Sequence, residues 1–182
     1  WRADIDRVNN IAFVCDRLGD KIFSIDVSDP SNMTIISSIA ITDPWDIQLD
    51  LNNNVAYVVT GGENTMHSID ISNPSSMVLL HSLTDTTYLS YADRLQLDLT
   101  NNVAYTIGLR ALTYPYITSI DISNPNSFSV LSRFDISKKP TDIALDLAND
   151  RAYIVADTSN TDQFHSINIS NPSSMSLAGV NT

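Results

Sequence analysis

The stretch from Ser68 to Pro74, with the sequence Ser-Ile-Asp-Ile-Ser-Asn-Pro, occurs in four near copies along the chain. The other copies are Ser24–Pro30, Ser119–Pro125 and Ser166–Pro172, and their prolines are separated by 44, 51 and 47 residues. Self-similarity at a period of about 20–50 residues is typical of repeat folds such as solenoids and propellers. The fold therefore depends on what one repeat forms and on how the repeats stack.

Each repeat contains four strand-like runs. In the second repeat, residues 46–50 alternate apolar and polar side chains, and an Asn-rich turn at 51–54 separates them from the apolar run 55–59. The signature stretch ends a third run, because proline cannot donate to a strand ladder and because Ser and Asn favour turns. A fourth run begins at Met77. Period-two alternation indicates strands, and helix signals are absent.

Four antiparallel strands at a period of about 45 residues are typical of a β-propeller blade, whereas a β-solenoid has shorter coils and parallel strands. We therefore predict an all-β fold, a β-propeller of four four-stranded antiparallel blades within a single domain, residues 1–182. The predicted blades span about residues 1–41, 42–84, 92–135 and 140–181. Three arrangements stay open: a closed four-bladed ring, part of a larger ring, or a half-ring completed by another chain through the faces of the end blades.

The run Ala56-Tyr57-Val58, followed by the signature at 68–74, resembles the LVIVD-repeat β-propellers. The resemblance covers essentially the whole chain and implies a surface or secreted propeller of a family whose activity is often unknown. This chain differs from the family pattern in the serine of the third strand, which is present in every repeat as Ser24, Ser68, Ser119 and Ser166.

The composition limits the possible partners and the compartment. The chain has 182 residues, a net charge of −11 and only ten Lys and Arg, so we expect it not to bind nucleic acid. The single cysteine, Cys15, excludes an intrachain disulfide, and its register predicts a buried apolar position. No apolar run approaches the roughly 18 residues of a membrane span, and we predict no membrane span.

Two further features bear on the cellular setting. We recognise no signal peptide, and the chain opens at Trp1 inside a repeat, so we expect a processed form, a fragment or one domain of a longer protein. Asn32 and Asn168 lie in Asn-x-Ser/Thr patterns that slightly favour a secreted protein, although whether they carry glycans stays open.

The repeats agree at the turn between strands one and two and at the signature turn, and differ at the opposite rim. This variable rim consists of the links between blades and of the loops between the second and third strands, among them the loop predicted from Gly108 to Tyr116 in the third repeat. Loops of this kind are free to carry function. We predict ligand contacts there, on aromatic platforms that suit protein or glycan partners. The candidates are Trp45, Tyr88, Tyr91, Arg110, Tyr114 and Tyr116, and the structural alternative is that the aromatics cap the sheets.

The sequence offers little catalytic chemistry. His67 and His165 share a register but belong to separate blades, and no Ser-His-Asp arrangement or phosphate loop can be assembled, so we predict no catalytic residue and no metal-ligating residue. Whether the protein is an enzyme stays open, with the balance against it. We predict no cofactor.

Charged residues of the first strands form two sets. Arg2, Asp46, Arg94 and Asp142 should pair across the propeller channel. The carboxylates that precede the first turn of each repeat should stabilise that turn, with calcium binding as the alternative, and they are Asp6, Asp50, Asp98 and Asp146.

We therefore predict a non-catalytic interaction or structural module of an extracellular or cell-surface protein. It would bind a protein or glycan partner at the variable rim, or copies of itself through exposed blade faces. The alternatives are an enzyme or carbohydrate-binding propeller with its site on that rim at the channel mouth, and a building block of an extended blade-to-blade assembly.

Overall fold

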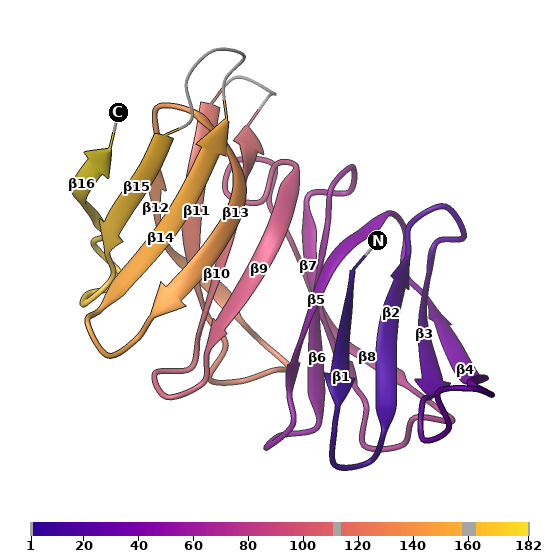
Figure 1. Cartoon of the computed structure of the whole chain (residues 1–182). Helices are drawn as coiled ribbons and strands as arrows, with labels where there is room; N and C mark the ends of the chain where they lie inside the picture. The colour runs from indigo at the N-terminus through magenta and orange to yellow at the C-terminus, as the bar shows by residue number, and fades with distance from the viewer. Residues whose placement is uncertain (1, 111–113, 158–162, 182) are drawn as a thin grey trace.

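The computed structural model describes residues 2–110, 114–157 and 163–181, and every regular element in these ranges is a β-strand. The strands form four sheets, each an antiparallel meander of four strands that follow one another in the chain. The all-β prediction and the prediction of four four-stranded blades are confirmed (Figure 1). None of the described residues forms a helix, so no helix in these ranges could cross a membrane.

The sixteen strands have the following bounds. The first sheet contains β1 (Ala3–Asp6), β2 (Ile11–Asp16), β3 (Lys21–Asp26) and β4 (Thr34–Ala40). The second contains β5 (Pro44–Asp50), β6 (Val55–Thr60), β7 (Thr65–Asp70) and β8 (Val78–Thr84). The third contains β9 (Ala92–Asp98), β10 (Val103–Arg110), β11 (Tyr114–Asp121) and β12 (Ser129–Asp135). The fourth contains β13 (Lys139–Asp146), β14 (Arg151–Asp157), β15 (Gln163–Asn168) and β16 (Ser176–Asn181).

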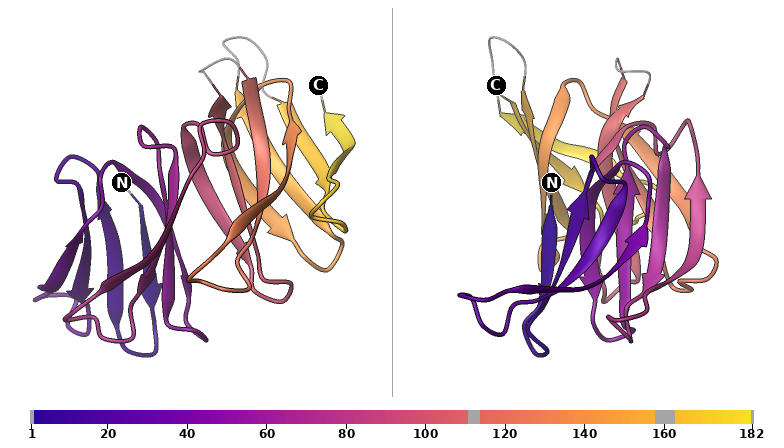
Figure 2. Two further views of the ribbon diagram at one scale, coloured as in Figure 1. Left: turned by 180° about the vertical axis from the view of Figure 1, so that it is seen from behind. Right: turned by 90° about the vertical axis from the view of Figure 1, so that its right-hand side faces the viewer.

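The sheets stand side by side in a row, and their first strands β1, β5, β9 and β13 contact one another in that order. The first and fourth sheets lie at opposite ends of the row in Figure 1 and in the left-hand view of Figure 2. The arrangement is therefore an open set of blades. The closed four-bladed ring, one of the three arrangements that the sequence left open, is not the one seen.

The core lies between the sheets, in one apolar cluster per pair of neighbours. Phe13, Cys15 and Ile22 of the first sheet pack against the second sheet, as Tyr57, Val59 and Met66 of the second pack against the third. A third cluster joins the third and fourth sheets in the same way, around Tyr105 and Ile117. Cys15 is fully buried in this core, as its register predicted.

The repeated turns use their polar residues locally. Asn10, Asn54, Asn102 and Asp150 close the first hairpin of each sheet in the left-handed region, with φ between 53° and 55°. The preceding carboxylate accepts backbone N–H groups of the same turn, as Asp50 does from Asn52 at 3.1 Å and from Asn53 at 3.2 Å. The four carboxylates thus stabilise turns, each in its own sheet. This agrees with the interpretation of these residues as turn-stabilising.

The third sheet departs from the prediction at its second loop. The sequence predicted a loop from Gly108 to Tyr116, but β10 continues to Arg110 and β11 begins at Tyr114, so that these two residues pair across the hairpin. A register shift between Ile107 and Gly108 accommodates the longer strands, since it re-aims the chain at the end of the pairing with β9.

Candidate binding site at the variable rim

The variable rim brings together side chains from loops and links that are distant in sequence. Trp45, at the start of β5, lies under the guanidinium of Arg17, whose carbon is 4.2 Å from the ring centroid. Arg17 also donates from Nε to Asp43 Oδ1 at 2.6 Å. Gly61, in the loop after β6, lies so close to the indole that a Cβ there would sit 2.2 Å from Trp45 Cε2. Trp45 therefore packs against both the guanidinium of Arg17 and the backbone of Gly61.

A pocket of about 220 Å³ opens beside Trp45, at the end of the first strands. Its lining consists of Arg2, Arg17, Trp45, Asp93 and Arg94. Three of the ten Lys and Arg of the whole chain therefore meet at one small opening of a protein whose net charge is −11. We call this opening the mouth pocket.

The arginines of the mouth pocket keep unused hydrogen-bond donors. A guanidinium carries five N–H groups, and Arg94 uses Nη1 on Asp93, while its buried Nε has no hydrogen-bond partner among the described residues. Arg94 Nε lies 3.8 Å from Asp142 Oδ1 of the neighbouring first strand, whereas the predicted pairing of this set across a channel stays a prediction. Arg2 is exposed.

Asp46 lies next to Trp45 in β5 and is only 5% exposed. Its burial raises the pKa of its carboxyl to about 6, although N–H groups of Leu95 and Ile47 and the nearby charges of Arg2 and Arg94 oppose the shift. The electrostatics of the mouth pocket and the protonation of Asp46 are therefore linked, since the same two arginines act on both.

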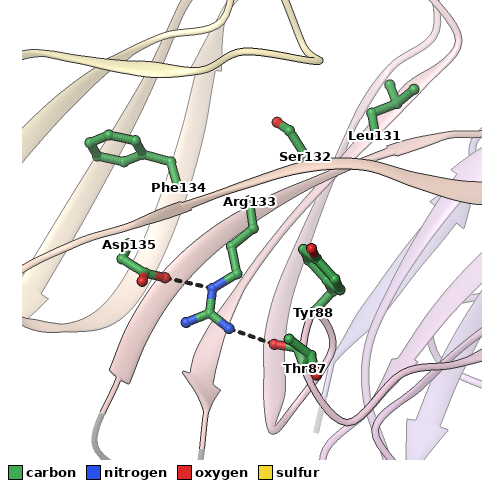
Figure 3. A pocket seen from close by; sticks show the side chains of 7 residues that line it. All are labelled: Thr87, Tyr88, Leu131, Ser132, Arg133, Phe134 and Asp135. Atoms are coloured by element: carbon green, nitrogen blue, oxygen red, sulfur yellow. Dashed lines mark hydrogen bonds and ion pairs between the residues drawn. The ribbon is translucent and has the colours of Figure 1, made fainter.

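A second depression on the same rim lies between the link from β8 to β9 and the outer strand β12. It has a volume of about 530 Å³, and Figure 3 shows its lining, which includes Tyr88 and Arg133. Arg133 donates to Asp135 and to the carbonyl of Thr87, and its guanidinium stands 4.7 Å from the ring centroid of Tyr116. This arginine is therefore engaged in tying the link to β12.

The six predicted ligand contacts do not form one cluster. Trp45 borders the mouth pocket and Tyr88 the second depression, whereas Tyr91 is 37% exposed and has a left-handed backbone with φ 53°. Tyr116 is fully buried, and its hydroxyl donates to the carbonyl of Ser90 at 3.0 Å, so it supports the rim from below and no ligand can touch it directly in this structure. The side chains of Arg110 and Tyr114 lie outside the described part of the structure.

Sequence reasoning missed Arg17 and Arg133 as rim residues. Each pairs with a carboxylate on the same rim, and Arg17 is a cation in a loop where the second and fourth repeats have no arginine. That contrast was a usable signal, whereas the contact of Arg133 with Tyr116 depends on how far β11 extends. Arg2 and Arg94 were predicted as channel residues, but not as part of a pocket.

The histidines lie apart, as predicted. His67 Nδ1 is hydrogen-bonded to Ser82 Oγ at 2.8 Å, and burial lowers the pKa of His67 to about 4. His165 of β15 is hydrogen-bonded to Ser137 in the link between β12 and β13, and burial lowers its pKa as well. Among the described residues, no group of three or more His, Cys, Asp and Glu side chains is placed to hold a metal ion.

Comparison with solved structures shows the fold. A protein from Lactobacillus plantarum is 13% identical with a TM-score of 0.80, and the match covers 100% of this chain and 55% of that one. A putative 6-phosphogluconolactonase from Bacteroides uniformis is 14% identical with a TM-score of 0.79, over 99% of this chain and 56% of that one. The periplasmic gluconolactonase PpgL of Pseudomonas aeruginosa is 10% identical with a TM-score of 0.75, over 99% and 52%. The chain thus spans little more than half the length of these propellers.

Comparison at the level of sequence gives the family. No curated protein matches the chain. The family model of the LVIVD repeat matches residues 9–40, 48–85 and 150–182, together more than half of the chain. The unmatched third sheet carries the same signature at 119–125 and the same four-stranded meander. The chain is therefore a member of the LVIVD repeat family.

Proposed function

We propose that this chain is a non-catalytic binding module of an extracellular or cell-surface protein, and that the mouth pocket binds a carboxylate-bearing segment of a partner protein. The observation that carries the proposal is the convergence of Arg2, Arg17 and Arg94 beside Trp45. Guanidinium groups match carboxylates in geometry and charge, and such charge-assisted hydrogen bonds are about twice as strong as neutral ones.

The pocket favours a peptide carboxylate over a sugar ring. Arg17 already covers one face of the Trp45 indole at 4.2 Å, and Gly61 packs closely against the same ring. A sugar that stacks on the face under Arg17 would have to displace that guanidinium, whereas a carboxylate can add to the free donors of the arginines. The secreted or surface setting is supported by the resemblance that the sequence carries and by its Asn-x-Ser/Thr patterns.

No specific observation favours an enzyme. The likeness to gluconolactonases is 10–14% in sequence identity and concerns the fold alone. The fold supports many functions, so a function has to be argued from its site.

The test is a titration of the chain with a hexaglutamate peptide. Binding is monitored by the fluorescence of Trp45 in a Trp1→Phe background. A chain of net charge −11 repels an acidic peptide in general, so a saturable change reports a local site. We expect Arg2→Ser to weaken the affinity by about tenfold, because a hydrogen bond to a charged group contributes roughly 1.5–3 kcal/mol.

The matched control is Arg7→Ser, which removes an exposed arginine from the opposite rim and should leave the affinity unchanged. A titration without saturation, or an equal loss of affinity in both variants, would overturn the proposal. Added salt should weaken the binding of the wild-type chain, since these charges are near the surface.

A further inference from the structure

The three joints between neighbouring sheets share one hydrogen bond. In each of the first three sheets, the signature serine donates from Oγ to the carbonyl of the signature proline in the next sheet. The pairs are Ser24 with Pro74 at 2.7 Å, Ser68 with Pro125 at 2.6 Å, and Ser119 with Pro172 at 2.6 Å. All three serines are fully buried. The serine by which this chain departs from its family pattern is thus a constant part of the joint.

An aromatic residue and a large aliphatic residue complete the joint on the same face. Phe13, Tyr57 and Tyr105 are directly opposite the three serines in the strand register, and each is at most 1% exposed. Ile22, Met66 and Ile117, two residues before each serine, are fully buried. We call this surface of a sheet its forward face.

The fourth sheet has an equivalent forward face, which no other described sheet covers. Tyr153 pairs with Ser166 and Val155 pairs with Phe164, in the register of the three covered faces. Phe164 is nevertheless 45% exposed and Val155 is 42% exposed. The rings of Tyr153 and Phe164 stack on each other with their centroids 5.4 Å apart. Ser166 finds no proline carbonyl within the described part of the chain.

The first sheet has the complementary surface, also uncovered. In the second sheet this back face buries Ile47, Val58 and Met77 against the forward face of the first. The same positions of the first sheet hold Ala3, Val14 and Met33, and Met33 is 60% exposed where Met77 is 9% exposed. No described serine donates to the carbonyl of Pro30, the counterpart of the three proline acceptors.

A polar contact extends this complementarity to the first strands. Asp46 Oδ2 accepts the backbone N–H of Leu95 in the next sheet at 2.9 Å. Asp142 is the counterpart of Asp46 in the fourth sheet, and its side chain is 70% exposed. In the first sheet the position of Leu95 is held by Ala3, which is exposed. A joint between the fourth and first sheets would therefore satisfy Asp142 as well as Ser166.

These two surfaces cannot meet within one chain, because they lie at opposite ends of the row (Figure 2). We propose that two copies of the chain join head to tail, with the fourth sheet of each copy packed on the first sheet of the other. In each of the two joints, Ser166 Oγ would donate to the Pro30 carbonyl, and Phe164 would be buried against the back face that includes Met33.

The size of related rings supports two copies. The solved propellers that this chain matches are nearly twice as long, since the match covers 55% or 56% of them. Two copies supply eight sheets, within the range of four to eight blades that is typical of propellers. A head-to-tail interface that is used twice closes a ring of two copies, whereas one that fails to close forms open filaments.

The first measurement is the mass in solution by light scattering over a dilution series. We expect a species of twice 20.0 kDa that dissociates on dilution. Phe164→Asp places a charge in both joints and should favour the 20.0 kDa monomer. We expect the dissociation constant of the two-copy species to rise by at least about a hundredfold. The matched control is Val8→Asp, which adds the same charge at an 86% exposed apolar residue of a hairpin turn.

A second measurement does not depend on a disruptive variant. The photo-crosslinking residue p-benzoylphenylalanine replaces Phe164 conservatively. After irradiation, the cross-links from position 164 should lead to residues in the first sheet of another copy. Monomers at every concentration, cross-links from fourth sheet to fourth sheet, or open-ended species of larger mass would each overturn the two-copy ring. Binding of the hexaglutamate peptide is a separate readout, so that either proposal can fail while the other stands.

Discussion

Asp46 is a carboxylate that the fold keeps away from water. Its two oxygens accept the N–H of Ile47 at 2.9 Å and of Leu95, in the next sheet, at 2.9 Å. Burial raises its pKa from 3.8 to about 6, against the effect of these hydrogen bonds and of Arg2 and Arg94. The charged form is thus less stable in the folded protein than in the unfolded chain.

The sign of the resulting pH dependence follows from this order of pKa values. Asp46 favours the folded state while it is protonated, below pH 4, and this contribution is lost as the pH rises through about 6. Relative to Asp46→Asn, the wild-type chain should therefore lose about 2 kcal/mol in the free energy of unfolding between pH 4 and 6.5, at 1.36 kcal/mol per pKa unit over the part of the shift that falls in this range. Urea unfolding at a series of pH values measures this difference.

The control for Asp46 is Asp70→Asn, because hydrogen bonds from Ser72 lower the pKa of Asp70, the opposite direction to that of Asp46. That variant should run parallel to the wild type from pH 4 to 6.5. A parallel profile of Asp46→Asn over the same range would contradict the account of Asp46.

At the scale of the sheet, the joint between blades rests on one serine hydroxyl and one proline carbonyl. Ser68 is fully buried and donates to Pro125 at 2.6 Å. Ser68→Ala leaves the Pro125 carbonyl buried without its donor, and we expect a loss of about 2 kcal/mol in the free energy of unfolding. Chemical denaturation measures it, at a protein concentration low enough to keep the chain monomeric.

Ser166→Ala is the internal control for the joint. It makes the same change in the same motif, but Ser166 has no next sheet within the chain. At low concentration we expect it to cost less than about 0.5 kcal/mol, as is usual for surface substitutions. An equal cost for Ser68→Ala and Ser166→Ala in the monomer would mean that the serine acts within its own sheet.

The elements that the sequence predicted well are those that local chemistry determines. The hairpins at Asn10 and its counterparts, and the turns after each signature, depend on Asn and Asp side chains that bond their own backbone. In the third sheet, β10 and β11 extend into the loop predicted at 108–116. The pairing between Arg110 and Tyr114 outweighed the turn propensity of Gly108 and Pro115.

The candidate site was predicted only in part, because its contacts join residues that are distant in the sequence. The place of Trp45 on the rim followed from the repeat pattern. Its partner Arg17 pairs with Asp43, which is 26 residues away, and such a pairing has no periodicity to reveal it. Tyr116 was predicted on the rim, but the early start of β11 places it under Arg133 and buries it.

At the scale of the whole molecule, the sheets form a linear array in which each apolar cluster joins two neighbours. Stability in such an array is approximately a sum over sheets and joints. The second and third sheets are covered on both faces, whereas the first and fourth are covered on one. Local opening should therefore be easier at the two ends than in the middle.

Hydrogen exchange of the backbone amides tests both this array and the pairing of copies. In dilute solution, amides of β2, β3, β14 and β15 should exchange faster than those of β6, β7, β10 and β11, which occupy the same positions in the covered sheets. At high concentration the end strands should gain protection, because a second copy covers their faces, while β6 and β7 should change little. In Phe164→Asp the pattern should stay that of the dilute chain at every concentration. Equal protection of end and middle sheets in dilute solution would contradict the linear array, since it would mean that the four sheets open as one unit.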